Sequence, residues 1–279
     1  MSYPTQYADL EAGGADGPYK DDDVAGDGAM PYGHPNMAAA PKQAMGHINL
    51  EEAGNSSYIA TANKLVRQGF IRKVYSILSV QLVFTFGLTL LFTFNSGIQS
   101  FVMANVWMVY TAFAGSFVCL IAMACCQSAA RTYPTNYMLL GMFTLLEGFL
   151  VAVTASFYES QSVVAAVGMT VVIFLGLTLY ACQTKRDFTT NGGILFSLLM
   201  SLILLGFLNI FWRSHFLETL YSAAGALIFS AYIVFDTQRL MEGKRVKLSV
   251  DDYVLAALNL YVDVMNLFLY ILSLLGKRR

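Results

Sequence analysis

Seven apolar segments constrain the fold of this chain more than any other feature of its sequence. Each is close to the ~20 residues that a helix needs to cross the hydrocarbon core of a bilayer. Hydrophobic residues make up 56% of the chain and charged residues only 13%, whereas a soluble domain carries roughly 25% charged residues. The sequence therefore predicts an all-α polytopic membrane protein with a seven-helix domain over residues 61–279. The segments run approximately over 74–94, 106–126, 137–157, 162–182, 193–212, 217–237 and 253–275.

Residues 1–60 have a different composition from the rest of the chain. They hold nine acidic residues against Lys20 and Lys42, five of the six prolines and no apolar run. Such a segment buries too little apolar surface to offset the entropy lost on ordering. Its acidity also argues against a secretory signal or a mitochondrial presequence. We therefore expect an acidic, disordered tail that lies in the cytosol.

The distribution of basic residues predicts the orientation, because cytosolic loops of membrane proteins are enriched in Lys and Arg. Four basic residues precede the first span, and the second, fourth and sixth loops carry one, two and four; the first and third loops carry none and the fifth only Arg213, which places the N-terminus in the cytosol. With seven spans, however, the basic tail at residues 277–279 falls on the opposite side. Either the last segment spans the membrane with a tolerated basic tail, or it dips in and returns; we favour seven helices. The basic residues are Lys64, Arg67, Arg72 and Lys73 before the first span, then Arg131, Lys185, Arg186, Arg239, Lys244, Arg245 and Lys247.

Apart from Glu218 at the start of the sixth segment, three acids lie within the apolar segments: Glu147, Asp236 and Asp263. An ionisable side chain is costly at that depth, so each one is a candidate for function. Asp236 and Asp263 lie near the cytosolic ends of consecutive antiparallel helices and should meet at similar depth. Two carboxyl groups at close range in a low dielectric tend to share one proton. Protonated, the pair is a neutral latch; ionised, it repels itself and offers oxygen ligands suited to Ca²⁺.

Other polar residues surround this predicted site. Asn259, Asn266 and Tyr270 share one helix face with Asp263, because they follow at i, i+4, i+7 and i+11 spacing. The two asparagines are interpreted mainly as interhelical hydrogen-bonding residues.

Glu147 and Arg131 complete the set of supporting candidates. Glu147 either lines the same aqueous path as the two aspartates or pairs with Arg131. Arg131 is otherwise a basic anchor at a helix end, or a counter-charge that favours the ionised form of the acidic pair.

The sequence predicts no resident cofactor and no stable metal site. The cysteines lie in or beside apolar segments and the three histidines are scattered outside them, so neither set has the spacing of a disulfide framework or a zinc site. Any metal binding is expected to be transient, with Ca²⁺ as the permeant ion at Asp236 and Asp263. The expected partners are the lipid bilayer and other membrane proteins of calcium or cell-death control, with no nucleic acid.

Several of these segments carry a family resemblance that covers roughly residues 64–279. Residues 235–240 read Phe-Asp-Thr-Gln-Arg-Leu, and residues 260–268 read Leu-Tyr-Val-Asp-Val-Met-Asn-Leu-Phe. Together with residues 251–257 they resemble the C-terminal signature of the Bax-inhibitor (transmembrane Bax inhibitor motif) family. Residues 71–82 resemble the first helix of that family. Residues 143–147 and 183–188 are similar to its lifeguard branch, nearest to the Golgi anti-apoptotic proteins.

This resemblance implies a fold in which the last helix is central and the other six wrap it. It also implies a non-enzymatic, pH-sensitive Ca²⁺ leak across an intracellular membrane, which lowers the calcium of the store and dampens apoptosis. The Golgi, the endoplasmic reticulum and a vacuole are the expected locations. The paired aspartates of the family fall on Asp236 and Asp263, and its second-helix arginine falls near Arg131.

Three alternatives belong to other functional classes. An intramembrane aspartyl protease also uses two aspartates on consecutive helices, but the Gly-x-Gly-Asp of such enzymes is replaced here by Leu260-Tyr261-Val262-Asp263. A seven-helix receptor is disfavoured because no Asp-Arg-Tyr ends the third span. A non-conducting membrane regulator of cell death remains open from sequence.

Overall fold

The computed structural model describes residues 50–126, 130–212, 214–242 and 252–278. The predicted disorder of residues 1–49 lies outside this range. In the described part the chain is a bundle of helices with no strand longer than an isolated bridge. The helices are α1 (Leu50–Phe94), α2 (Ser96–Ala104), α3 (Trp107–Cys125), α5 (Thr135–Ser156), α6 (Ser160–Gln183), the 3₁₀ turn η1 (Phe188–Asn191), α7 (Gly192–Phe211), α8 (His215–Glu242) and α9 (Tyr253–Leu275).

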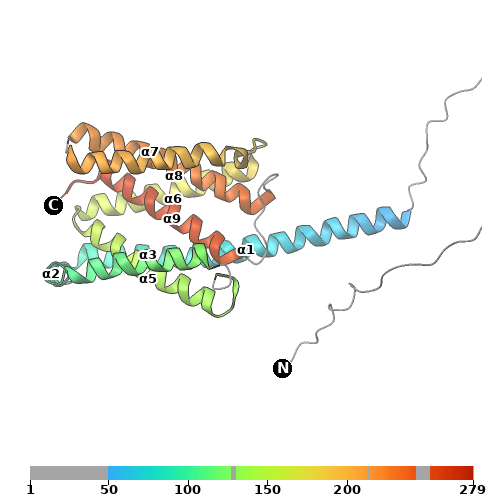
Figure 1. Ribbon diagram of the computed structural model, residues 1–279, viewed down its shortest axis with the longest axis horizontal. Helices are drawn as coiled ribbons and strands as arrows, with labels where there is room; N and C mark the ends of the chain where they lie inside the picture. The colour runs from blue at the N-terminus through green and yellow to red at the C-terminus, as the bar shows by residue number, and fades with distance from the viewer. Residues whose placement is uncertain (1–49, 127–129, 213, 243–251, 279) are drawn as a thin grey trace, which may run out of the picture. The chain divides into compact units, whose positions relative to one another are not determined.

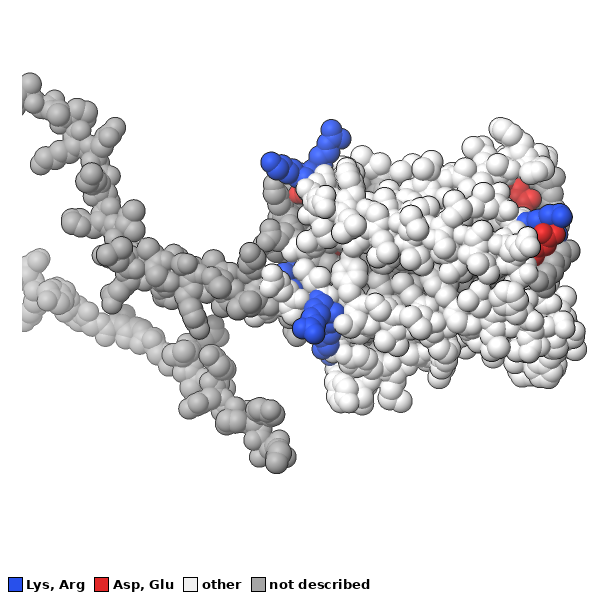
Figure 2. All heavy atoms as spheres, turned by 180° about the vertical axis from the view of Figure 1, so that it is seen from behind, with Lys and Arg blue, Asp and Glu red and all other residues white. Residues whose placement is uncertain are grey.

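Seven of these helices are long and apolar enough to cross a membrane, which confirms the predicted fold class. On the face shown in Figure 2, charged side chains gather at the two ends of the bundle, and the surface between them is almost free of charge. The first span falls within Val66–Phe94 of α1, a range that contains the predicted segment 74–94. Residues 50–60, which the sequence assigns to the tail, are instead the first part of α1.

The last helix, α9, is the centre of the bundle (Figure 1). In its most apolar stretch 67% of the residues are buried, against 11% to 44% in the other six spans. α9 packs against α1, α5, α6 and α8, while α3 packs on α5 and α7 packs on α8. The expectation of a central C-terminal helix is therefore confirmed, with four helices in direct contact and two in an outer position.

α8 and α9 approach each other closely because small residues line their contact. A Cβ atom on Gly225 would lie 2.5 Å from the ring of Tyr270, so a glycine is needed where that ring crosses α8. One turn away, the Ser222 hydroxyl donates a hydrogen bond to the Ser273 hydroxyl at 2.8 Å. Small residues permit such close approach of membrane helices. The two helices that carry Asp236 and Asp263 are thereby held in a fixed register.

α9 runs without a break from one end of the bundle to the other. We call the end where α9 begins the near end and the end where it stops the far end. At the far end the backbone amide of Glu159 donates to the carbonyl oxygen of Lys277 at 2.9 Å, and the two side chains form an ion pair at 3.0 Å. Arg278 pairs with Glu218 at the start of α8. α9 is one unbroken helix over Tyr253–Leu275, which favours a full span over a segment that dips in and returns. Two acids, Glu159 and Glu218, thus accompany the basic tail at the far end.

Candidate functional site

The structure brings Asp236 and Asp263 together between α8 and α9. Both residues are buried, at 8% and 6% exposure. Their carboxyl groups lie within hydrogen-bonding reach of each other. α8 and α9 run antiparallel; Asp236 lies six residues before the end of α8, and Asp263 is the eleventh residue of the 23-residue helix α9, about half-way along it. Of the predicted site residues, these two are the pair that the fold places in mutual contact.

Arg239 is a member of this site that the sequence analysis did not single out. Its Nη1 atom lies 3.0 Å from Oδ1 of Asp236, one turn away on α8. Its guanidinium group also lies over the ring of Phe235, 5.5 Å from the ring centre. The sequence signal for its role is the i, i+3 spacing of an acid and a base on one helix. A second missed residue, Tyr232, lies four residues before Asp236 and interacts electrostatically with both acids.

The end of α8 that carries these residues is anchored from two sides. Arg67 on α1 donates from Nη2 to the carbonyl oxygen of Arg239 at 2.7 Å and from Nε to that of Met241 at 3.3 Å. Gln238 accepts from the backbone amide of Phe188 at 2.7 Å and donates to the carbonyl oxygen of Arg186 at 2.8 Å. These contacts satisfy polar backbone groups that would otherwise be orphaned where helices end. They also fix the position of the turn of α8 that carries Asp236.

Arg131 does not take the position that the sequence suggested. Its Nε and Nη2 atoms bind the two carboxylate oxygens of Asp252 at 2.7 and 3.2 Å. Such a two-point contact is the strong form of an arginine–carboxylate pair. The predicted pairing of Arg131 with Glu147 is therefore wrong, and the cation beside Asp236 is Arg239. Arg131 instead fixes the residue that precedes α9.

The start of α9 is held at a second point by Tyr253. The Nζ atom of Lys73 lies 3.3 Å from the centre of the Tyr253 ring, and the Asn136 amide donates to its hydroxyl at 3.2 Å. A cation over an aromatic ring is attracted by the negative face of the ring. α1 and α5 thus hold the near end of α9 in place.

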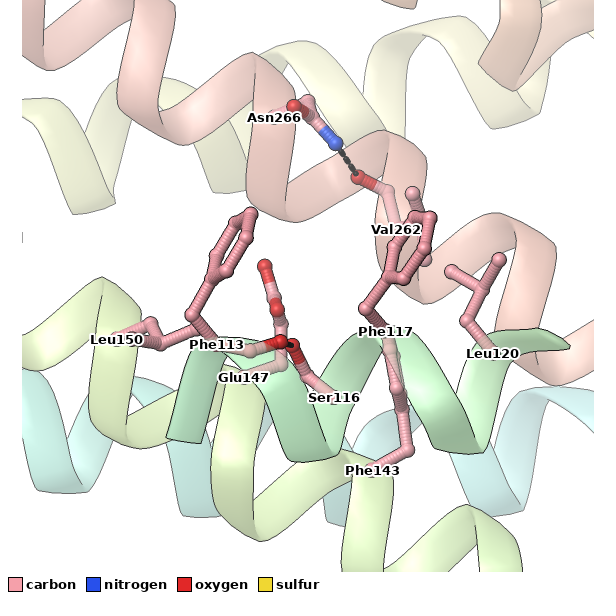
Figure 3. Close-up of a pocket in the computed structure, with 9 residues that line it drawn as sticks. All are labelled: Phe113, Ser116, Phe117, Leu120, Phe143, Glu147, Leu150, Val262 and Asn266. Carbon is pink, nitrogen blue, oxygen red and sulfur yellow. Dashed lines mark hydrogen bonds between the residues drawn. The ribbon is translucent and has the colours of Figure 1, made fainter. Parts of the chain in front are cut away.

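Asn266, one turn after Asp263 on α9, lines a cavity together with Glu147 of α5 rather than meeting Asp236. This cavity of about 250 Å³ lies between α3, α5 and α9 (Figure 3). The Asn266 amide donates to the carbonyl oxygen of Val262 in its own helix at 2.8 Å. Asn259 is half-buried one turn before Asp263 and makes no side-chain hydrogen bond within the described part of the chain. Asp263 and Asn266 therefore meet different neighbouring helices.

Comparison with known proteins identifies the family. A family model described as "Inhibitor of apoptosis-promoting Bax1" matches residues 67–279, which include every residue of the site. The chain belongs to this Bax inhibitor family. Its recognition from residues 235–240 and 260–268 is thereby confirmed, and the family makes the chain a membrane regulator that opposes apoptosis.

Curated relatives of this Bax inhibitor protein carry the lifeguard name. It is 36% identical to Protein lifeguard 3 of Homo sapiens over 220 residues, which cover 77% of this chain and 71% of that one. Identity to Protein lifeguard 3 of Mus musculus is 34% over 262 residues, with 88% and 85% covered. Protein lifeguard 4 of Mus musculus is 40% identical over 219 residues, with 78% and 89% covered.

Proposed function

We propose that this protein is a pH-sensitive Ca²⁺ leak channel of an intracellular membrane, with Asp236 and Asp263 as its latch. The observation that carries the proposal is the contact of two buried carboxyl groups on the two helices that pack most intimately in the bundle. An acid inside a membrane span is costly and needs a compensating reason. A family of apoptosis inhibitors provides the biological setting, because release of stored calcium promotes cell death.

The chemistry of the pair sets the sign of its pH response. Two carboxyl groups in contact in a low dielectric do not both ionise readily, so at low pH they hold a proton between them. The shared proton bonds α8 to α9 and closes the latch. At higher pH the proton is lost, the two negative charges repel each other, and the near ends of α8 and α9 separate.

The ionised pair also suits a hard divalent cation. Ca²⁺ takes carboxylate oxygens as ligands, and Oδ2 of Asp263 is buried without a hydrogen-bond partner in the described structure. A buried acceptor without a partner costs free energy. A passing cation, or a water molecule, would relieve that cost. The proposed role of the pair is therefore both gate and transient ion contact.

The proposed setting is the Golgi, the endoplasmic reticulum or a vacuole, with the N-terminus in the cytosol. Support comes from basic residues at the near end: Lys73 contacts Tyr253 and Arg131 pairs with Asp252, both where α9 begins, and Arg186 is bound by Gln238 near the end of α8. In that orientation the pair senses cytosolic protons. A leak through it lowers the calcium of the store and so dampens apoptosis.

Calcium flux from purified protein in liposomes tests this proposal. Flux through the parent protein is expected to rise as the pH rises, and the Asp236→Asn, Asp263→Asn double variant is expected to lose that dependence. Glu218→Gln is the matched control, because it removes a carboxylate at the far end; its pH profile should match that of the parent. An unchanged pH profile in the double variant would show the acidic-pair mechanism to be wrong.

The same experiment tests the alternative of a non-conducting regulator, and the burial of α9 bears on the alternative of a protease. A non-conducting regulator of cell death would give no flux above that of empty liposomes at any pH. An intramembrane aspartyl protease needs a substrate backbone beside its aspartates, but Leu260 and Tyr261 before Asp263 are both 0% exposed. Their burial leaves no room for a substrate strand on that side, and this favours the channel.

A further inference from the structure

The cavity beside Glu147 carries a carboxyl group that the proposed latch does not use. From it we infer a second site, which binds a small membrane-soluble amine through its ammonium group. The inference rests on the cavity between α3, α5 and α9 and on the polar atoms that face it (Figure 3). It is independent of the acidic pair and of any calcium flux.

The position of the cavity determines the route by which a ligand enters. Glu147 is the thirteenth residue of the 22-residue helix α5, about half-way across its span. Phe113 and Phe117, which flank the carboxyl group in Figure 3, are 64% and 58% exposed on the side of the bundle that faces lipid. The cavity therefore opens into the hydrocarbon region. Its ligand must dissolve in the bilayer, which excludes a hydrated metal ion.

The direction of the Glu147 side chain is fixed by its two neighbours on α5. A Cβ atom on Gly115 of α3 would lie 2.9 Å from a methyl group of Leu146, so α3 and α5 touch closely there. A Cβ atom on Gly148 would lie 3.2 Å from the hydroxyl oxygen of Thr85 on α1. With Leu146 against α3 and Gly148 against α1, α5 has little freedom to rotate. Glu147 consequently points into the cavity toward α9.

The polar atoms that line the cavity are mostly acceptors, which favours a ligand rich in donors. The Ser116 hydroxyl donates to the carbonyl oxygen of Phe113 at 3.0 Å, so its free lone pairs can only accept. The Asn266 amide nitrogen donates to the carbonyl oxygen of Val262, and the amide oxygen can accept a further hydrogen bond. An ionised Glu147 is an acceptor alone. An alkylammonium group has up to three N–H donors and a positive charge, so it matches this set.

The apolar residues that line the cavity, and its volume, limit the size of the apolar part of the ligand. Phe113, Phe117 and Phe143 supply aromatic rings, which attract cations as well as apolar groups. A volume of about 250 Å³ is at the small end for a ligand pocket. One ring or a short chain next to the ammonium group fills such a space. Any longer tail extends through the mouth between the phenylalanines into the lipid.

Equilibrium binding to the full-length protein in lipid nanodiscs tests the inference. The probe is tritiated 4-phenylbutylamine, and the neutral 4-phenylbutanol is its uncharged match. Glu147→Gln is expected to weaken binding of the amine at least tenfold and to change binding of the alcohol less than twofold. Glu159→Gln removes a carboxylate outside the cavity and should leave both unchanged. Equal binding of the amine to the parent and to Glu147→Gln overturns the inference.

A second variant keeps the test decisive if Glu147→Gln does not fold. Ser116→Leu retains the carboxyl group but fills the cavity, so binding of both probes should be lost; unchanged binding overturns the inference. Competition then identifies the source of the amine. Displacement of the probe by hexadecylamine in the bilayer assigns the site to amine lipids. Displacement only by short-chain amines assigns it to free small amines.

Discussion

At the scale of single residues, the charge next to Asp236 should set the pH at which the proposed latch opens. The Arg239 guanidinium lies 3.0 Å from the Asp236 carboxyl and favours its ionised form. Arg239→Gln removes that charge, so the pair should keep its proton to a higher pH. The pH of half-maximal Ca²⁺ flux in liposomes is expected to rise by about one unit.

The control for this prediction is Arg186→Gln, which removes an exposed positive charge at the same end of the bundle. Its flux profile should follow that of the parent, because a charge in water is screened. A midpoint that moves equally in both variants would point to a surface-charge effect, and one that falls in Arg239→Gln would contradict the role of the ion pair.

Sequence reasoning found some residues of the site and missed others for physical reasons. Asp236, Asp263 and Glu147 were visible because a carboxyl group in an apolar segment has an obvious cost. The partner of Arg131 was not visible, since Asp252 lies 121 residues further along the chain. The division between the acidic pair and the Glu147 cavity depends on which neighbour each side of α9 meets, which only packing determines.

At the scale of the helices, the contact between α8 and α9 should be the least tolerant of added volume. The Cβ atom introduced by Gly225→Ala would lie 2.5 Å from the Tyr270 ring, so the ring or a helix must move. Overpacking of this kind costs about 1–3 kcal/mol. The free energy of unfolding, measured by denaturant titration in detergent micelles, should fall by that amount.

Two further variants check the cause of this loss. Gly168→Ala in α6 places its Cβ atom in open space, so its stability should equal or exceed that of the parent. Tyr270→Leu combined with Gly225→Ala should recover part of the loss, because the smaller side chain makes room. Equal losses at Gly168 and Gly225 would mean that helix flexibility, rather than the α8–α9 contact, limits stability.

The helices themselves were mostly predictable from the sequence. Apolar segments of membrane length leave no alternative to a helix, since every backbone polar group must be satisfied internally. The start of α1 was not predictable in this way, because residues 50–65 are polar and carry no membrane signal. The short helix α2 and the turn η1 were also missed. They owe their formation to local capping, in which Asn95 and Asp187 accept backbone amide hydrogen bonds.

At the scale of the whole molecule, an ion pair holds each end of α9 in place. Arg131 and Asp252 fix the near end, while Lys277 and Glu159 fix the far end. The charge rule alone left the last segment ambiguous, because it counts basic residues without their acidic partners. Because α9 is one unbroken helix of membrane length, the chain is expected to expose residues 186 and 277 on opposite sides of the membrane.

Cysteine labelling in sealed vesicles measures this directly. Arg186→Cys and Lys277→Cys, each made in a background without the four native cysteines, place single thiols in side chains that are exposed at the two ends. A membrane-impermeant maleimide added to one face should label the variant at 186 and spare the variant at 277; added to the other face, it should do the reverse. Labelling of both from the same face would mean that α9 returns before crossing.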